Sequence, residues 1–296
     1  MRVVTLLPAA TEIVAALGGA GHLVGISHEC DYPPSVLALP RVTVTSVDAR
    51  ASGAVIDAEV RRLRDAGRPV IGVDAEQLRG LAPDLVITQG LCEVCAVADG
   101  QVHRLAAALH PAPRVLSLEA RRLDEIWEDI RRVGNALDLG DEAEELVLGL
   151  NSRLRRLGSS PPTGGARVLC VEWLEPLYLA GHWVPELVAA AGGWDVGAEP
   201  GSHSARREWR ELSRLRPDHI IVMLCGFGIE RARQELDSFQ DAEALELLAR
   251  VPVWIIDGNA YTSRPGPRVV DGASRIQSAL AGHEGRGVER WQPPAA

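Results

Sequence analysis

Short apolar segments that alternate with stretches of helical spacing constrain the fold of this chain more than any other feature. The first segment covers residues 3–7, and the helical pattern that follows it opens at Pro8 and stops at Gly18 and Gly19. A strand buried on both faces of a parallel sheet gives such a nearly continuous apolar run. The alternation therefore predicts an α/β fold in which helices cover both faces of parallel sheets.

The same pattern divides the 296 residues into two lobes, as the length also suggests. No element is predicted in the polar stretch at 43–69. Further strands are predicted at 23–26, 70–73, 85–88, 115–118, 168–171, 220–224 and 253–256, with helices near 75–80 and 101–109. We expect an N-terminal α/β lobe at 1–119, a bridging helical element at 120–158, a C-terminal α/β lobe at 166–282 and a flexible tail at 283–296.

A faint internal repeat supports two related lobes. The segment Leu81-Ala82-Pro83-Asp84-Leu85-Val86-Ile87 is echoed by Leu215-Arg216-Pro217-Asp218-His219-Ile220-Ile221, and in each a helix end is predicted to turn into a strand. A duplication of one ancestral lobe is a plausible origin.

Charge and residue usage exclude several classes of function. The formal net charge is −9, which opposes binding to nucleic-acid phosphates. All 31 basic residues are arginine, so Schiff-base enzymes and P-loop nucleotidases, which need lysine, are excluded. The motifs of serine hydrolases, zinc proteases and dinucleotide-binding enzymes are absent. None of these motifs therefore marks a nucleophile or a hydride-transfer site.

The chain has no apolar run of the roughly 18 to 20 residues that a membrane span needs. The run at 3–7 is too short for a signal peptide, so as written the chain is expected in the cytoplasm, or in the periplasm if a leader has been removed. An odd number of cysteines, five, favours reduced thiols over a disulfide framework.

Aromatic side chains gather where ligands of open α/β sheets bind, in loops that follow predicted strands. Such loops would offer flat surfaces for a large, partly apolar ligand, although each ring considered alone is as well explained as ordinary core. The six aromatic residues in question are Tyr32, Trp173, Tyr178, Trp183, Phe227 and Tyr261.

Polar candidates occupy the same loops. Arg264 suits an anionic or amide-rich ligand edge, with a salt bridge to a neighbouring carboxylate as the alternative. His182 and His203 are candidate polar contacts, or solvated loop histidines. Glu29 and Gln89 complete the set of candidate ligand-binding residues.

Thiols and an imidazole form a second candidate group. His28 and Cys30 share one loop, and Cys92 and Cys95 form a Cys-x-x-Cys in another. These four would suit tetrahedral zinc, and the Cys-x-x-Cys alone would suit a redox pair. Buried or incidental thiols, including Cys225, are the other interpretation.

The N-terminal run at 2–12, the segment Val24-Gly25-Ile26-Ser27, Asp31-Tyr32-Pro33-Pro34 and Ser263-Arg264-Pro265-Gly266-Pro267-Arg268 resemble the cobalamin-binding substrate-binding proteins of ABC importers. The likeness extends to about residue 281. Receptors for heme and siderophores share this helical-backbone architecture.

This resemblance implies two Rossmann-like lobes bridged by a long backbone helix near 121–157, with a corrinoid held in a cleft between the lobes. It places Trp173, Tyr178, Tyr261 and Arg264 on the ligand side, with Tyr32 near it. It also implies an ABC permease as partner, and neither nucleic acid nor membrane insertion.

Two features depart from the family pattern besides the absent leader: the His28-Glu29-Cys30 segment and the thiols of the loop at 89–95. They suggest that His28, Cys92 or Cys95 approaches the cobalt or another metal. The leading hypothesis is reversible cobalamin binding in which no bond is made or broken, so the expectation is a binding protein and not an enzyme. The alternatives are a cytoplasmic zinc or redox protein on the same fold, and a sensor that binds a small metabolite.

Overall fold

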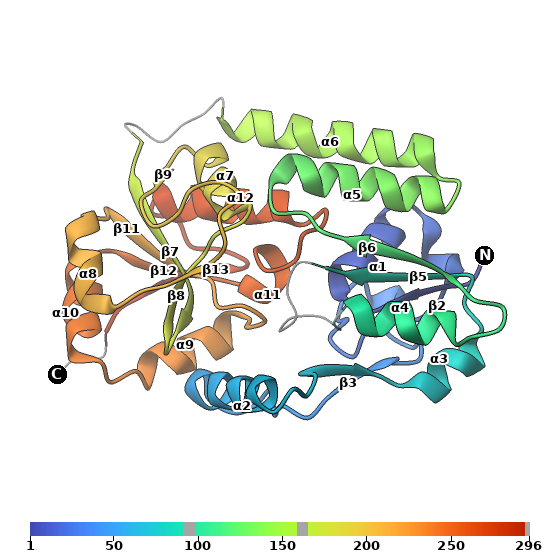
Figure 1. Ribbon diagram of the computed structural model, residues 1–296. Coiled ribbons are helices and arrows are strands. Elements are labelled where there is room, and N and C mark those ends of the chain that lie inside the picture. Colours follow the sequence, from blue (N-terminus) through green and yellow to red (C-terminus); the bar gives the residue numbers. More distant parts are fainter. Residues whose placement is uncertain (91–96, 98, 159–164, 294–296) are drawn as a thin grey trace. The chain divides into compact units, whose positions relative to one another are not determined.

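The computed structural model describes residues 1–90, 97, 99–158 and 165–293 (Figure 1). These residues form a mixed α/β fold that divides into two compact units. The first unit comprises Met1–Ala51, Val55–Ala120 and Asp124–Gly149, and the second comprises Ser52–Ala54, Arg121–Leu123 and the chain from Leu150 onward.

The first unit is built on a parallel sheet with the strand order β2-β1-β5-β6. Val3 and Val4 of the inner strand β1 are fully buried, and Val4 pairs with Val86 of β5. Burial on both faces accounts for the continuous apolar runs of these strands. The strands are β1 (Val3–Thr5), β2 (Leu23–Gly25), β5 (Leu85–Gln89) and β6 (Arg114–Leu118).

The predicted bridging element consists of two helices, α5 and α6. They pack closely within the first unit, where a Cβ added to Gly134 would lie 2.5 Å from the Cβ of Ala143. Arg131 of α5 donates to Glu144 of α6 at 2.7 Å. The helices that begin in or belong to the first unit are α1 (Pro8–Ala16), α3 (Ala75–Leu81), α4 (Asp99–Ala107), α6 (Gly140–Gly158) and the short η1 (Gly19–His22) and η2 (Pro34–Val36), while α2 (Gly53–Asp65) and α5 (Leu123–Ala136) begin in the second.

The stretch at 43–73 differs from the prediction. The strand expected at 70–73 does not join the parallel sheet, because β4 (Ile71–Val73) pairs antiparallel with β3 (Thr43–Thr45) in a separate ribbon. The polar stretch contains helix α2, which buries Leu63 and most of Val60 in the core of the first unit. Most of the other positions of α2 are polar, so its average polarity concealed a helical face.

The second unit carries a mixed sheet with the order β10-β8-β7-β11-β12-β13, and β9 pairs with β7. β7, β11 and β12 run parallel at its centre. Helices α7 and α12 lie on one face and α9 on the other (Figure 1). The strands are β7 (Arg167–Leu174), β8 (Leu177–Leu179), β9 (Trp194–Asp195), β10 (Ala205–Arg206), β11 (His219–Val222), β12 (Val253–Ile256) and β13 (Val288–Trp291). The helices are α7 (Val184–Ala190), α8 (Trp209–Leu212), η3 (Ser213–Leu215), α9 (Ile229–Asp237), α10 (Ala242–Arg250), α11 (Gly258–Tyr261) and α12 (Val269–Leu280).

The C-terminal segment is not the flexible tail that its composition predicted. Strand β13 pairs antiparallel with β12 and adds an edge to the central sheet. Its residues Val288 and Trp291 are each 2% exposed, and the Trp291 indole donates to Asp237 Oδ1 at 2.8 Å. Two buried anchors thus hold a segment that is otherwise rich in Gly and Arg.

The internal repeat corresponds to one structural device in both units, which we call the Arg–Asp clasp. The backbone N–H of Arg2, next to β1, donates to Asp84 Oδ2 at 2.7 Å, and that of Arg167, at the start of β7, donates to Asp218 Oδ2 at 2.8 Å. In both units the arginine side chain also donates to a carbonyl at the end of the helix that precedes the aspartate, which is Leu81 in the first unit and Leu215 in the second. The helix ends turn through left-handed residues, Ala82 and Arg216. The clasp aligns the first strand of each sheet with its neighbour.

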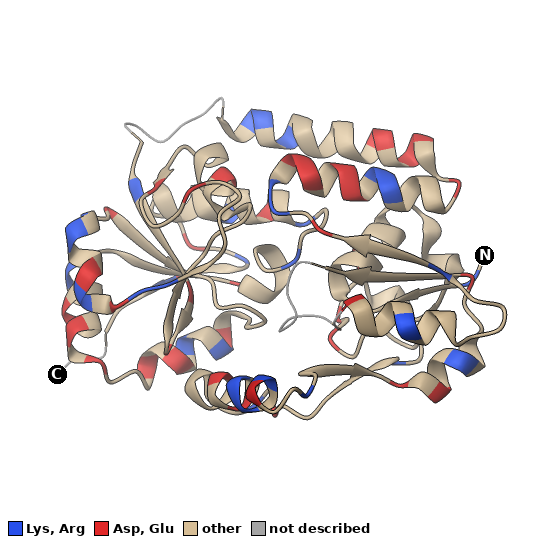
Figure 2. Ribbon diagram, viewed as in Figure 1, with Lys and Arg blue, Asp and Glu red and all other residues tan. Residues whose placement is uncertain are grey.

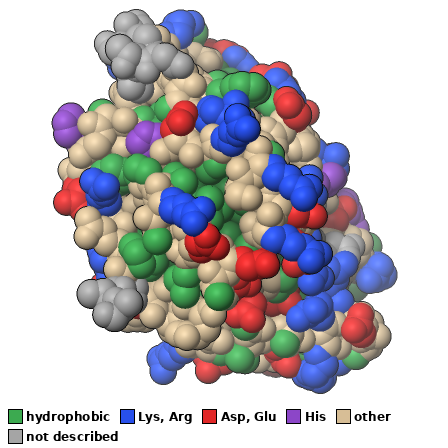
Figure 3. Space-filling model, turned by 90° about the vertical axis from the view of Figure 1, so that its left-hand side faces the viewer, with side chains coloured by type: hydrophobic (Ala, Val, Ile, Leu, Met, Phe, Trp, Pro, Cys, Tyr) green, Lys and Arg blue, Asp and Glu red, His purple; other side chains and the backbone are tan. Residues whose placement is uncertain are grey.

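Charged residues lie mainly on the helices, and the strands are largely neutral (Figure 2). On the face drawn in Figure 3, acidic side chains lie beside basic ones. Such exposed pairs contribute about 0 to 1 kcal/mol each to stability. Of the helices in the described ranges, none has the length and apolar character that crossing a membrane requires.

A buried carboxyl group gives the second unit a pH-dependent stability. Asp195 is 6% exposed, and burial raises its pKa to about 6, although its Oδ1 accepts hydrogen bonds from the N–H groups of Gly197 and Ala198. Burial also raises the pKa of the neighbouring Cys170 thiol. Because the folded state prefers protonated Asp195, the stabilisation is complete below about pH 4 and is lost as the pH rises through 6.

Asp195→Asn should therefore become more stable relative to the parent protein as the pH rises. Between pH 4.5 and 8 we expect the difference in the free energy of unfolding to change by about 2 kcal/mol in favour of the variant. Urea unfolding at several pH values measures this difference. Glu211→Gln, which removes an exposed charge from α8, is the control and should show no such trend. A pH-independent difference for Asp195→Asn would contradict the assignment.

Candidate ligand-binding site

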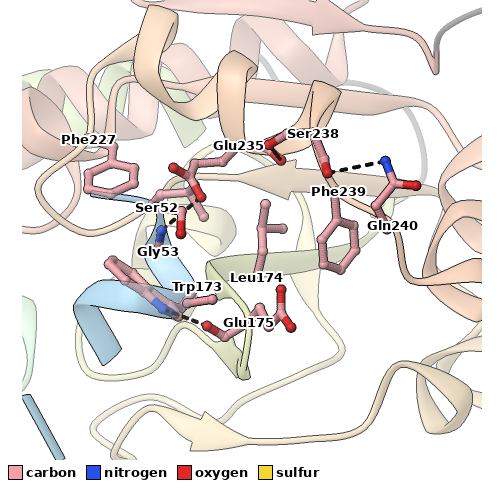
Figure 4. Close-up of a pocket in the computed structure, with 12 residues that line it drawn as sticks. Ser52, Gly53, Trp173, Leu174, Glu175, Phe227, Glu235, Ser238, Phe239 and Gln240 are labelled. Atoms are coloured by element: carbon pink, nitrogen blue, oxygen red, sulfur yellow. Dashed lines mark hydrogen bonds between the residues drawn. The ribbon is translucent and has the colours of Figure 1, made fainter. Parts of the chain in front are cut away.

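A cavity of about 190 Å³ lies in the second unit (Figure 4). Aromatic and aliphatic side chains form part of its wall, and residues with carboxylate, hydroxyl and amide groups form the other part. It is lined by Ser52, Gly53, Ala54, Trp173, Leu174, Glu175, Leu224, Phe227, Glu235, Ser238, Phe239 and Gln240.

Trp173 and Phe227 form a ring pair in the wall, which Phe239 also lines, and both residues of the pair were predicted as ligand-binding residues. Their ring centroids are 5.3 Å apart at an interplanar angle of 50°. Trp173 lies in β7, and its indole N–H donates to the carbonyl of Glu175 at 3.2 Å. Phe227 lies in the turn after β11, where Gly226 takes a φ of +75° that other residues rarely adopt. The central strands therefore hold both rings at the same end of the sheet.

Helix α9 contributes a carboxylate that the sequence analysis missed. Glu235 Oε2 accepts the backbone N–H of Gly53 at 2.9 Å, and its Oε1 pairs with Arg231 at 3.0 Å. The Arg231 guanidinium lies over the Phe227 ring, 5.0 Å from its centroid. The spacing of Arg231 and Glu235 by four residues indicates an ion pair on one helix face. No sequence pattern relates either residue to Gly53.

Three further predicted residues, Tyr178, His182 and Trp183, lie in the same unit but do not line the cavity. Tyr178 is in β8 and pairs with Trp173, so both lie in strands and not in the predicted loops. Trp183 precedes α7, is 5% exposed and donates its indole N–H to the Thr262 carbonyl at 2.9 Å. Its burial and this hydrogen bond make Trp183 a residue of the core.

His182 lies beside a second histidine. Its ring centroid is 5.5 Å from that of His203. Its backbone is left-handed, with a φ of +55°. Burial lowers the pKa of His182, and the nearby His203 and Arg121 lower it further. The imidazole is therefore neutral at physiological pH.

Tyr261 and Arg264 belong to α11 and the segment after it. The Tyr261 ring lies 4.5 Å from the Arg275 guanidinium, and a Cβ on Gly287 would overlap this ring. Its ring thus packs against its own unit. Arg264 is 8% exposed and donates to Asn259 Oδ1 at 2.7 Å, which fixes the guanidinium beside α11.

The first unit holds the remaining predicted contacts. His28 Nδ1 lies 2.6 Å from Thr43 Oγ1, and Arg41 donates to the carbonyls of Ser27 and Cys30. Burial, and then Arg41, lower the pKa of His28, so this imidazole is also neutral. Of the other candidates in this unit, Tyr32 is 44% exposed and Glu29 is also exposed, whereas Gln89 at the end of β5 is 9% exposed.

Only two residues of the predicted metal set, His28 and Cys30, lie within the described part of the chain. Cys30 is 3% exposed and its sulfur lies 3.0 Å from Thr11 Oγ1, which makes it a core thiol. Cys92 and Cys95 lie outside the described residues. Within the described part of the chain, no group of three or more His, Cys, Asp and Glu side chains is arranged to hold a metal ion.

Comparisons with known proteins extend over almost the whole chain. A vitamin B12-binding protein of Pectobacterium carotovorum subsp. carotovorum (strain PC1) is 22% identical over 285 residues, covering 94% of this chain and 88% of the relative. A periplasmic heme binding protein from Pseudomonas aeruginosa superimposes with a TM-score of 0.70 at 20% identity, covering 99% of this chain and 95% of its own. The periplasmic vitamin B12 binding protein of Vibrio cholerae gives a TM-score of 0.64 at 21% identity, covering 95% and 96%.

A family profile gives the firmest assignment. The profile described as "Periplasmic binding protein" matches residues 3–253, which include most of both units. Its members bind ligands and are not enzymes, in agreement with the expectation from the sequence. This chain belongs to the periplasmic binding protein family.

Proposed function

We propose that the protein reversibly binds cobalamin or a closely related corrinoid and delivers it to an ABC importer. The single observation that carries the proposal is the Trp173–Phe227 pair on the wall of the cavity. Offset and tilted aromatic rings offer apolar surface to a large macrocycle. The relative that binds vitamin B12 supports the choice of ligand class.

The size of the cavity limits what it can hold. Sites for drug-sized ligands measure about 300 to 1,000 Å³, and this cavity measures about 190 Å³. It therefore takes a part of a corrinoid, such as one peripheral side chain and the adjoining ring edge. In our proposal, Trp173 and Phe227 contact that part of the ligand.

We also propose that other predicted residues contact the ligand, and single substitutions test each of them. In the first unit these are Tyr32, Glu29, Gln89 and His28, the last as the residue that approaches the metal of the ligand. In the second unit they are Tyr178, His182, Tyr261 and Arg264. The site of action is proposed to be extracytoplasmic, following the family, with an ABC permease as partner.

Calorimetric titration with cobalamin, heme and a ferric siderophore, side by side, tests the proposal. We expect saturable binding of cobalamin, with weaker binding or none for the other two. Cobalamin at a hundred times its Kd should add about 2.7 kcal/mol to the free energy of unfolding. Thermal melting with each compound checks this independently. Preferential binding of heme or siderophore, or no effect of cobalamin, would refute the proposal.

A further inference from the structure

The polar part of the cavity wall is rich in hydrogen-bond acceptors. It contains the carboxylates of Glu175 and Glu235 and the hydroxyl groups of Ser52 and Ser238. The Gln240 amide lies beside Ser238 and donates to its carbonyl at 3.3 Å (Figure 4). Among the described residues that line the cavity, none is Arg, Lys or His. The wall is therefore suited to ligand groups that donate hydrogen bonds.

Glu235 is held rigidly in this wall. Its side chain is 14% exposed, one oxygen accepts from Gly53 and the other pairs with Arg231. Each carboxylate oxygen keeps a second lone pair, because a carboxylate offers about four acceptor positions. A half-buried, fixed acceptor interacts more strongly than an exposed one, since water screens it less. Glu175, by contrast, is exposed and follows the last residue of β7.

The guanidinium that pairs with Glu235 does not reverse this character. The Arg231 guanidinium lies beside the cavity and pairs with Glu235 and the Phe227 ring. The lining carries two carboxylates, and Arg231 pairs with one of them, Glu235. A ligand carboxylate entering the cavity would meet repulsion, whereas a primary amide would find acceptors for its N–H groups.

We infer that Glu235, assisted by Glu175, is a specificity-determining residue that selects corrinoids with amide side chains over those with carboxylate side chains. This inference rests on the proposed function and names the chemistry of the ligand periphery that the cavity accepts. By the same chemistry the cavity disfavours the propionates of heme.

Two corrinoids that differ in their side-chain ends test the inference. Dicyanocobinamide carries amides, and dicyanocobyrinic acid carries carboxylates on the same ring. We expect the parent protein to bind the amide form at least about tenfold more tightly, the factor that corresponds to one charge-assisted contact. The ratio of the Kd for the carboxylate form to the Kd for the amide form should fall by about tenfold in Glu235→Gln and by less in Glu175→Gln.

Glu243→Gln on helix α10 is the matched control. It removes the same charge from an exposed site outside the cavity, so it corrects for repulsion by the net charge of −9. The ratio of the two Kd values should not change in this variant. Circular dichroism melting checks that Glu235→Gln still folds, and if it does not, the exposed Glu175→Gln decides.

The outcomes separate the two claims. The inference fails and the proposed function stands if the parent protein binds dicyanocobinamide but the ratio of the two Kd values is unity. The same holds if neither Glu235→Gln nor Glu175→Gln changes that ratio. An equal fall of the ratio in Glu243→Gln also overturns the role of Glu235. If the parent protein binds neither corrinoid, the proposed function fails and the inference fails with it.

Discussion

Replacing Trp173 and Phe227 together by alanine is expected to weaken cobalamin binding by at least about a hundredfold. Each ring contributes about 1.5 kcal/mol or more when a ligand covers it, and 1.4 kcal/mol is tenfold in Kd. Calorimetric titration measures the change. Each single variant should show an intermediate loss, since the two rings lie 5.3 Å apart and cover neighbouring parts of the ligand.

Trp194→Ala is the control for this experiment. Trp194 is 60% exposed on β9 and lies beneath the Arg167 guanidinium, away from the cavity. Its loss removes an indole of the same size without touching the proposed contacts. An unchanged Kd in a folded Trp173/Phe227 double variant would show that cobalamin binds elsewhere.

Gly258→Ala is expected to destabilise the second unit by about 3 kcal/mol. Gly258 is the first residue of α11, and a Cβ there would lie 2.8 Å from the Met223 carbonyl oxygen and closer still to that of Leu224. These backbone atoms belong to the loop that carries Phe227, so they cannot move aside without disturbing the turn. Overpacking of this kind costs about 1 to 3 kcal/mol, and more where backbone must shift.

The corresponding fall in Tm is roughly 6 to 12 °C for a unit of about 150 residues. Gly149→Ala provides a control in the opposite direction. Gly149 lies in α6, where a Cβ would meet no atom within 4 Å, so alanine should stabilise the helix by about 0.5 to 1 kcal/mol. Equal melting of the two variants would show that the close approach at Gly258 is relaxed in solution.

The central strands could be predicted from the sequence because burial on both faces leaves a direct signature. Val168–Val171 and Val253–Ile256 are apolar throughout, and β7 and β12 include them. Edge strands carry a weaker signal, since only part of each is buried. In β13 the two buried residues, Val288 and Trp291, are three positions apart and break the period-2 pattern of a strand.

Helix α2 was missed for a different reason. Ile56, Val60 and Leu63 recur at the spacing of one helix face and pack in the core of the first unit, so a signal was present. The neighbouring Val55 is 56% exposed, and the remaining positions are mostly polar. Average polarity concealed a helix that periodicity would have found.

The candidate site likewise contains residues that the sequence indicates and residues that only the structure reveals. Trp173 and Phe227 could be selected because aromatic residues near strand ends are uncommon in this chain, whose aromatic content is 4%. Trp183 satisfied the same criterion but is buried, with its indole bonded to Thr262. Glu235 could not be selected, because its importance depends on Gly53, which is 182 residues away along the chain. Only tertiary structure brings such a pair together.

The Arg–Asp clasp also affects how each sheet forms. It joins residues 82 positions apart in the first unit and 51 positions apart in the second. Because the entropy lost on closing a flexible loop grows with the logarithm of its length, the first closure costs about 0.4 kcal/mol more. The second sheet is therefore aligned by closure of the shorter loop, whereas β1 of the first sheet can be aligned only after the 82 positions up to Asp84 have been synthesised.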